Sequence, residues 1–264
     1  MSISIHPSSI VDPKAELAEG VSVGPFCTIG PNVTIGAGTT LKSHIVIDGH
    51  TTIGKDNSIF PFTALGLDPQ HTLYKGEEST LVIGDRNILR EGVTMHPGTH
   101  VGNMTTVIGD DNFFLAGSHV AHDAVVGNHV VAVNTTNIGG HAVIEDYVYM
   151  GAFTGVKPWI RIGKHAMVSA MTGVMADVIP YGNVFGSRAE LVGLNLIGMK
   201  RRGFSKDEIT MVRRAYRLMF AEEGTFVERL EEVSRLYGDV EIVRDMLKFI
   251  EAGGDKALCH PAKG

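Results

Sequence analysis

The sequence predicts a mainly β protein, a parallel β-helix of six-residue repeats that is followed by a small bundle of α-helices. Three observations lead to this fold class. Aliphatic residues recur with a period of six over most of the chain, glycine is abundant with 32 residues among 264, and the period stops after Pro180, where helix start and stop signals begin. Such repeats bury a continuous core only when neighbouring repeats stack.

The six-residue period is the strongest of these signals. It begins with eleven consecutive aliphatic positions, namely Ile5, Val11, Leu17, Val23, Ile29, Ile35, Leu41, Ile47, Ile53, Ile59 and Leu65. It resumes at Ile83, slips by one residue across positions 100–106, restarts at Ile108 and continues to Val174. Neither an α-helix, with a period of about 3.6, nor a simple alternating strand, with a period of 2, gives this pattern. Short strands joined by tight turns do.

The composition agrees with narrow coils joined by tight corners. Glycine often follows the aliphatic residue, as in Ile29-Gly30 and Ile53-Gly54, and only 7% of the residues are aromatic. This pattern resembles the left-handed β-helix proteins, whose coils hold three hexads, or about 18 residues. The resemblance implies a left-handed parallel β-helix.

One stretch of the repeat departs from the pattern. Leu65 and Ile83 are one coil length apart, yet the positions in phase between them, His71 and Glu77, are polar. We therefore expect this stretch to leave the wall of the β-helix, which the stacked hexads form, as a loop. Loops on a rigid scaffold often carry ligand contacts, but a tolerated surface insertion explains the spacing equally well.

The helical signals divide the chain into two predicted domains, a β-helix over 1–190 and a helical domain over 191–264. Ser205 and Thr225 each begin a capping-box pattern, and glycines stand where helices would end. The expected helices cover 191–200, 205–221, 225–236 and 240–252.

Charge and composition exclude several classes of function. The formal net charge of -6 gives no general attraction to nucleic acid or to acidic membranes. We find no secretion signal and no apolar stretch long enough to span a bilayer, so we expect a cytoplasmic protein. Cys27 and Cys259 show neither metal-ligand spacing nor a disulfide framework, and we expect inert thiols, with Cys27 inside the wall.

The densest group of chemically capable residues is 118–123, followed by 139–141. Val120 and Ile138 are 18 positions apart, so their hexads stack and place His122 and His141 on adjacent coils. A histidine of near-neutral pKa can take a proton from a hydroxyl, and the adjacent Asp123 can fix its tautomer. Polar residues that simply fill solvated turns are the alternative reading for any single histidine.

The same segments resemble the UDP-N-acetylglucosamine O-acyltransferases, a family of hexapeptide-repeat enzymes. The likeness covers nearly the whole chain and rests on 118–123, Gly140-His141, 177–181, 193–195 and 198–204. It implies transfer of a 3-hydroxyacyl chain from acyl carrier protein to the sugar 3-hydroxyl of UDP-N-acetylglucosamine, the first step of lipid A biosynthesis, in a homotrimer without cofactor or metal.

The resemblance also implies roles for individual residues. His122 would be the general base, Asp123 would orient it, and the Gly140 N–H would stabilise the thioester oxyanion. The implied substrate-binding residues are His119, His141, Asn195 and Arg201, and Ala170 would limit acyl-chain length. We add Gln70 and Lys157 as substrate-binding residues, the latter because a lysine is suited to contact the nucleotide diphosphate. Basic residues also stand out in this acidic chain, and because carrier protein is acidic we expect it to dock on Lys200, Arg202, Arg213, Arg214 and Arg217, with a solvated helix face as the alternative reading.

Three alternatives stay open at this point. Acyl transfer to a 3-amino sugar nucleotide needs the same residues. A zinc hydratase like the γ-class carbonic anhydrases could draw its ligands from His119, His122 and His141. A non-catalytic trimeric scaffold is the third. Lys157-Pro158 stands where the family usually has His-Gln, and we expect both residues to extend the face that carries His122 and His141.

Overall fold

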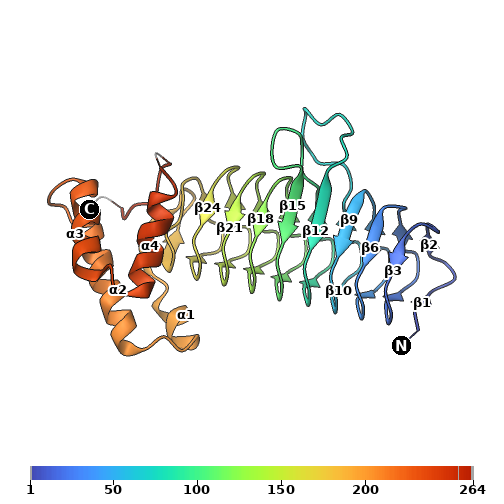
Figure 1. Ribbon diagram of the computed structural model, residues 1–264, viewed down its shortest axis with the longest axis horizontal. Helices are drawn as coiled ribbons and strands as arrows, with labels where there is room; N and C mark the ends of the chain where they lie inside the picture. Colours follow the sequence, from blue (N-terminus) through green and yellow to red (C-terminus); the bar gives the residue numbers. More distant parts are fainter. Residues whose placement is uncertain (1, 255, 263–264) are drawn as a thin grey trace.

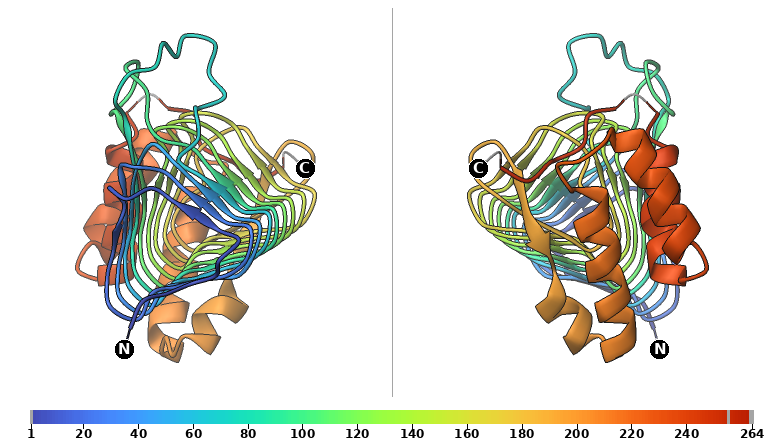
Figure 2. Two further views of the ribbon diagram at one scale, coloured as in Figure 1. Left: turned by 90° about the vertical axis from the view of Figure 1, so that its right-hand side faces the viewer. Right: turned by 90° about the vertical axis from the view of Figure 1, so that its left-hand side faces the viewer.

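The computed structural model describes residues 2–254 and 256–262, and it shows an elongated β-helix with helices at its carboxy-terminal end (Figure 1). Seen along the long axis, the coils stack into a three-sided prism (Figure 2). Strands of two to five residues form its three sheets, and all strand pairs in them are parallel except the last, between β27 and β28. This is the left-handed parallel β-helix that the sequence predicts, with a helical part after it.

Each sheet takes every third strand along the chain as far as β26, and β27 and β28 both join the first sheet. The eleven-stranded sheet, here sheet A, contains β1 (Ser4–Ile5), β4 (Ser22–Val23), β7 (Thr40–Leu41), β10 (Ser58–Ile59), β13 (Ile88–Leu89), β16 (Phe113–Phe114), β19 (Val131–Ala132), β22 (Tyr149–Met150), β25 (Met167–Val168), β27 (Gly182–Phe185) and β28 (Glu190–Leu194). The nine-stranded sheet B contains β2 (Ile10–Val11), β5 (Thr28–Ile29), β8 (Val46–Ile47), β11 (Ala64–Leu65), β14 (Thr94–Met95), β17 (His119–Val120), β20 (Asn137–Ile138), β23 (Gly155–Val156) and β26 (Gly173–Val174). The eight-stranded sheet C contains β3 (Glu16–Leu17), β6 (Val33–Ile35), β9 (His50–Ile53), β12 (Thr80–Ile83), β15 (Thr105–Ile108), β18 (Val125–Val126), β21 (Val143–Ile144) and β24 (Arg161–Ile162).

The register explains the six-residue period. Val120 pairs with Ile138, which lies 18 positions later on the next coil, and both side chains are buried in the prism interior. The periodic aliphatic residues therefore form one continuous core, and the residue before each of them faces outward. Cys27 lies in this core with 1% exposure, as the sequence predicts.

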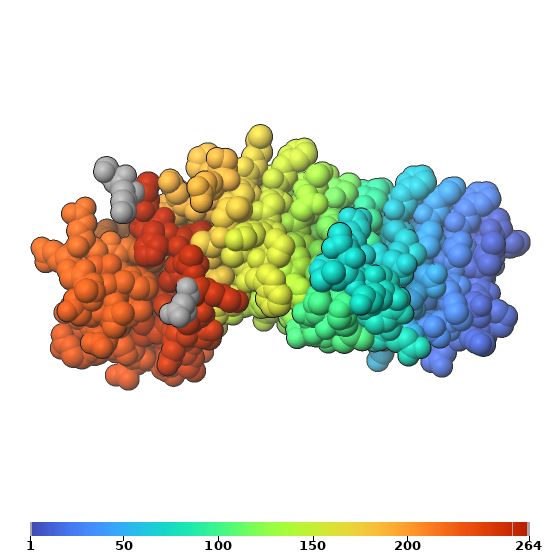
Figure 3. All heavy atoms as spheres, turned by 90° about the horizontal axis from the view of Figure 1, so that it is seen from above, coloured from blue at the N-terminus to red at the C-terminus, as the bar shows by residue number. Residues whose placement is uncertain are grey.

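Two insertions leave the wall near the middle of the prism. Leu65 pairs with Met95, 30 positions later, so this coil carries 12 residues more than the usual 18. Met95 pairs with Val120, 25 positions later, an excess of seven. The loop expected after Leu65 is confirmed, and Ile83 at its far end returns to the wall by pairing with Ile53. Both loops project on the same side (Figure 1) and form a raised patch on the surface (Figure 3).

Among the described residues, four helices follow the prism, α1 (Leu196–Arg201), α2 (Lys206–Met219), α3 (Phe226–Tyr237) and α4 (Glu241–Glu251). Both predicted capping boxes are present, at Ser205 and at Thr225. The helix expected over 191–200 is wrong in its first half, because residues 190–194 extend sheet A as the antiparallel strand β28. We therefore propose a domain boundary after Leu194 rather than at 190. In the described part of the chain, no helix has both the length and the apolar character that a bilayer crossing requires.

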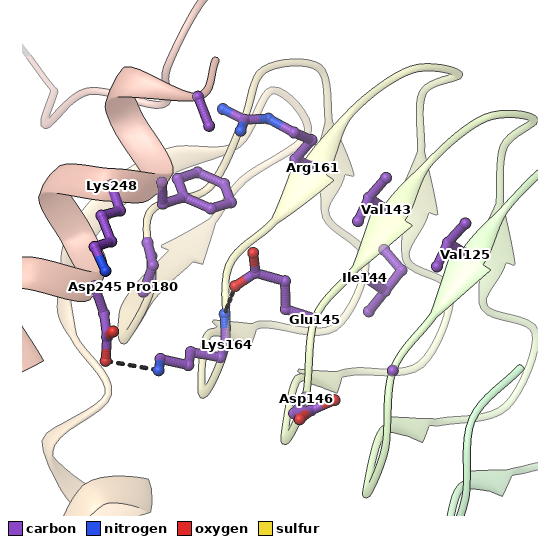
Figure 4. A pocket seen from close by; sticks show the side chains of 13 residues that line it. Val125, Val143, Ile144, Glu145, Asp146, Arg161, Lys164, Pro180, Asp245 and Lys248 are labelled. Atoms are coloured by element: carbon purple, nitrogen blue, oxygen red, sulfur yellow. Dashed lines mark hydrogen bonds and ion pairs between the residues drawn. The ribbon is translucent and has the colours of Figure 1, made fainter.

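A cleft of about 520 Å³ lies between α4 and the outer face of β18, β21 and β24. Figure 4 shows its lining residues, some of which connect the helical part to sheet C. Lys164 Nζ lies 2.6 Å from Asp245 Oδ2 on α4, and the backbone N–H of Lys164 donates to Glu145. Arg161 pairs with the buried Asp177 at 2.7 Å and lies over the Phe249 ring. The cleft thus joins the two parts of the chain and contains none of the predicted site residues.

Candidate active site

His122 and Asp123 lie in the turn between β17 and β18, at the corner where sheet B meets sheet C. Asp123 adopts φ +60°, which turns the chain and lets the two neighbouring side chains meet. His122 Nδ1 lies 2.8 Å from Asp123 Oδ2. Because a carboxylate only accepts hydrogen bonds, Nδ1 is the donor and Nε2 is left as the basic nitrogen. This is the geometry of a histidine base oriented by an acid.

The Asp123 carboxylate is completely buried and fully hydrogen-bonded. Its Oδ1 accepts from the backbone N–H groups of Thr99 and Asn103, and its Oδ2 accepts from the Thr99 hydroxyl as well as from His122. Burial by itself would raise the pKa of Asp123, but the hydrogen bonds from Thr99 and His122 outweigh it and lower the pKa below its ordinary value. The carboxyl group is therefore ionised at neutral pH.

Gly140 lies directly against the His122 ring. A Cβ at this position would be 2.7 Å from His122 Cε1 and 2.8 Å from Nε2, so a side chain would fit only if the His122 ring moved. The Gly140 N–H donates to no acceptor within residues 2–254 and 256–262. An unused backbone donor in the residue that packs against the His122 ring is what an oxyanion site requires.

His141 and Trp159 form the next layer of the corner. The His141 ring meets His122 edge-on at 5.0 Å between centroids and stacks on Trp159 at 3.7 Å. Burial lowers the pKa of His141, against the opposing effect of Asp123, so this imidazole is neutral at neutral pH. A neutral, stacked imidazole offers a hydrogen-bonding edge without competing for the proton.

A cavity of about 300 Å³ opens beside His122. Gln70 from the first insertion, His119 from β17 and Gly140 are among its lining residues. His71, next to Gln70, places its ring 4.6 Å from that of His122. Burial, together with repulsion from nearby histidines, lowers the pKa of His119 to about 4, so its ring is neutral as well. The first insertion therefore contributes contacts at the cavity.

The two insertions are tied to each other. His100 of the second insertion lies 2.8 Å from Glu77 Oε1 of the first, and its backbone N–H also donates to that oxygen. The backbone bond from His100 is the main reason why the pKa of Glu77 falls to about 2. The loop that carries Gln70 and His71 is thus anchored to the loop that holds Asp123.

Several predicted residues lie elsewhere. Asn195 and Arg201 line a separate cavity of about 770 Å³ on the sheet A side, which shares no lining residue with the His122 cavity. Ala170 is exposed in the turn after β25 and lines neither cavity. The predicted docking residues are all exposed, and they are Lys200, Arg202, Arg213, Arg214 and Arg217.

The expectation for Lys157 and Pro158 needs a correction. Pro158 lines the His122 cavity and stacks in line with His122 and Gly140 on the two preceding coils. The exposed Lys157 does not line this cavity. The reason is the register, because residues 18 apart stack, which aligns Lys157 with Gly139 and places Trp159 on His141.

The zinc ligands expected for a hydratase do not come together in the described residues. The metal-capable set is His122, Asp123 and His141, without His119, whose Nδ1 bonds to the Thr94 hydroxyl. Each Asp123 oxygen already has two hydrogen-bonding partners, so this set has no free carboxylate ligand.

Sequence reasoning missed the residues that hold Asp123 and His141. Thr99, Gly102 and Asn103 surround the Asp123 carboxylate, and Trp159 supports His141. A signal existed for the first three, because the one-residue slip of the repeat falls at 100–106, a segment that contains Gly102 and Asn103 and begins next to Thr99. No signal marked Trp159 apart from its distance of 18 residues from His141.

Comparison with known proteins gives a consistent result. Residues 177–259 match the family model described as Udp N-acetylglucosamine O-acyltransferase, domain 2. The chain is 48% identical over 261 residues to the acyl-[acyl-carrier-protein]–UDP-N-acetylglucosamine O-acyltransferase of Caulobacter vibrioides, with 99% of each chain covered. The enzyme of the same name from Rhizobium johnstonii is 44% identical, with 100% of this chain and 97% of the relative covered.

Solved structures agree in fold over the whole chain. The UDP-N-acetylglucosamine acyltransferase of Francisella novicida superposes with a TM-score of 0.93 at 32% identity and covers 98% of this chain and 95% of its own. The corresponding protein of Acinetobacter baumannii gives 0.92 at 37% identity, with coverage of 98% and 99%.

Proposed function

The chain belongs to the acyl-[acyl-carrier-protein]–UDP-N-acetylglucosamine O-acyltransferase family, and from this premise we propose how its own residues perform the reaction. It is an acyltransferase that moves an acyl chain from acyl carrier protein to UDP-N-acetylglucosamine, the first step of lipid A biosynthesis. The finer proposal is that the chain is a 3-hydroxyacyl group, that the acceptor is the sugar 3-hydroxyl and that the reaction takes place in the cytoplasm.

The mechanism rests on one observation: the His122–Asp123 pair lies against Gly140, whose N–H donates to no acceptor among the described residues. His122 Nε2 takes the proton of the sugar hydroxyl as its oxygen attacks the thioester carbonyl carbon. The carbonyl oxygen becomes an oxyanion, which the Gly140 N–H stabilises. When the C–S bond breaks, the proton passes from His122 to the departing thiolate, so the free carrier thiol and the ester are the products. Asp123 stabilises the imidazolium between the two proton transfers.

The separation of the two cavities supports a site shared between subunits. Asn195 and Arg201 lie on the sheet A side, whereas His122 lies at the corner of sheets B and C. A homotrimer of three-sided prisms would let the Asn195 and Arg201 of one subunit complete the His122 cavity of the next. In such a trimer the exposed Arg213, Arg214 and Arg217 on α2 would meet the acidic carrier protein near the shared site.

The mechanism is tested by replacing His122 with alanine. We expect turnover to fall by roughly 100-fold or more in a folded protein, the usual scale for losing a general base. Products are weighed by mass spectrometry after incubation with hydroxyacylated carrier protein and either UDP-N-acetylglucosamine or its 3-amino analogue. His6→Ala, at an exposed histidine near the amino terminus, is the control. Near-normal turnover in His122→Ala contradicts the mechanism, and product only with the amino sugar contradicts the proposed acceptor.

The shared site is tested by mixing two inactive variants. His122→Ala and Arg201→Ala chains that are co-expressed would form some sites with both residues intact, so part of the activity should return. Activity that stays at the level of the separate variants in a mixed assembly means that no site combines the two residues from different chains.

A further inference from the structure

The seven-residue insertion before β15 surrounds a single buried carboxylate. We propose that Thr99 is a positioning residue for the reaction, and that the insertion serves as a cradle that holds Asp123 against His122. The inference rests on the proposed function of His122 as the general base. It assigns a role in catalysis to a residue that contacts neither substrate.

The hydrogen bonds of the loop indicate that it holds the Asp123 carboxylate in place. Of the four hydrogen bonds to the Asp123 carboxylate, three come from this insertion, at 3.0 Å from Thr99 N, 2.6 Å from Thr99 Oγ1 and 2.8 Å from Asn103 N. The fourth comes from His122. Thr99 is itself completely buried, so its hydroxyl is out of contact with bulk solvent.

The loop is folded so that its donors converge. The Thr99 carbonyl accepts from the N–H groups of Gly102 and Met104, which closes a tight turn around the carboxylate. Gly102 approaches so closely that a Cβ there would lie 2.3 Å from Asp123 Cγ and 2.6 Å from His141 Cε1. On the other side, Thr106 Oγ1 accepts from the Asp123 backbone N–H at 2.7 Å. Both the side chain and the main chain of Asp123 are thus fixed.

This arrangement matters for the proton transfer. With Oδ1 bound by two backbone N–H groups, the carboxylate cannot rotate, and Oδ2 stays directed at His122 Nδ1. The Thr99 hydroxyl stabilises the anionic form, which has to remain charged while His122 becomes an imidazolium. Loss of this hydroxyl would leave a buried anion with one donor fewer and more freedom to move. The result would be a base that is misplaced for part of the time.

A buried threonine can also be needed only for stability, so the experiment has to separate the two roles. Thr99→Val removes the hydroxyl at nearly constant volume, whereas Thr99→Ser keeps it. Thr63→Val is the matched control, because Thr63 is equally buried and its hydroxyl donates only to backbone carbonyls of the wall. Asp123→Asn supplies the background for a double-mutant cycle.

We expect Thr99→Val to lower kcat by about 10- to 100-fold with KM for both substrates nearly unchanged, the scale for a lost hydrogen bond to a charged group. Thr99→Ser should recover most of kcat, and Thr63→Val should lose little. In the Asp123→Asn background the same Thr99→Val change should lower kcat by less than about threefold, since the anion that the Thr99 hydroxyl stabilises is already gone. Thr99→Ala takes the place of Thr99→Val if the valine variant does not fold.

Two results would overturn the inference. One is a folded Thr99→Val protein with wild-type kcat, and the other is an equal loss with and without the Asp123 carboxylate, which would mean that Thr99 acts on stability or on another group. Both presuppose an active wild-type enzyme. If the wild-type chain transfers no acyl group to a nucleotide sugar, the proposed function fails instead.

Discussion

Replacing Gly140 with alanine should disable the base without unfolding the protein. Gly140 does not lie in the left-handed region, so alanine is compatible with its backbone. The added Cβ would be 2.7 Å from His122 Cε1, whereas ordinary contacts begin at 3.4 Å, so the imidazole has to move by the difference of 0.7 Å. The bond to Asp123 and the edge contact with His141 oppose this movement.

A displacement of about 1 Å at a reacting group costs on the order of 100-fold in rate. We therefore expect kcat of Gly140→Ala to fall by about 10- to 100-fold, or about 1.4 to 2.7 kcal/mol in activation free energy. The assay is initial-rate transfer from acylated carrier protein to UDP-N-acetylglucosamine, with the melting temperature as the check on folding. Gly155→Ala adds the same methyl group to the same cavity wall, where no atom lies within 4 Å, and should cost much less.

The outcome that contradicts this reasoning is specific. A folded Gly140→Ala enzyme with wild-type kcat would mean that His122 does not need its observed position, and the roles of both residues would have to be withdrawn. An equal loss in Gly155→Ala would instead point to filling of the cavity rather than to displacement of the base.

Three further predictions concern other parts of the chain. Burial, and then nearby positive charge, lowers the pKa of His165 to about 4, so the unfolded chain takes up a proton between about pH 6.5 and 4 while the folded chain does not. Stability is therefore lost as the pH falls through this range, and His165→Phe should reduce the drop in melting temperature between pH 7 and 5. Ala170→Gly should favour longer acyl donors and Ala170→Met shorter ones, measured by competition between carrier proteins with different chains, and unchanged preference in both would place the end of the acyl groove elsewhere. Lys157→Ala should raise KM for the nucleotide sugar with little change in kcat if the exposed lysine meets the diphosphate, and unchanged kinetics would remove it from the site.

The repeat could be predicted because its period is set by the backbone geometry of the coil. Each hexad places one aliphatic residue in the prism interior, and the 18-residue stacking of Val120 on Ile138 follows directly. The lengths of the insertions could not be predicted in the same way. Twelve extra residues are two whole hexads, so the first insertion leaves the phase unchanged, and only the second, with seven, shifts it by one.

The sequence predicted only part of the active site, for a related reason. Stacking places His122 over Gly140 and Asp123 over His141, and this follows from counting along the chain. The cradle around Asp123 comes from a loop outside the repeat, so no register predicts that Thr99 and Asn103 converge on one carboxylate. Residue spacing likewise gives no information on how separate faces of the prism meet between subunits.

The backbone conformation at Asp123 decides which substitution can test the role of its carboxylate. Asp123 and His141 have φ near +60°, and a non-glycine residue in this region often indicates functional strain. Here the same conformation recurs at other corners, for example at His129 and Phe153, so it belongs to the fold and not to catalysis. Alanine in the left-handed region costs about 1 kcal/mol or more, whereas asparagine tolerates it.

Asp123→Ala should consequently lose stability for two reasons at once, the backbone conformation and the emptied cradle, and its activity would be hard to interpret. Asp123→Asn keeps the corner, removes the charge and replaces one accepting oxygen with an amide NH2, which can only donate. We expect it to melt at a higher temperature than Asp123→Ala and to lose at least 10-fold in kcat, because a neutral amide stabilises the imidazolium less than a carboxylate does. Equal melting temperatures for the two variants would show that the corner conformation costs alanine nothing. A wild-type kcat for Asp123→Asn would show that His122 does not depend on the charge beside it.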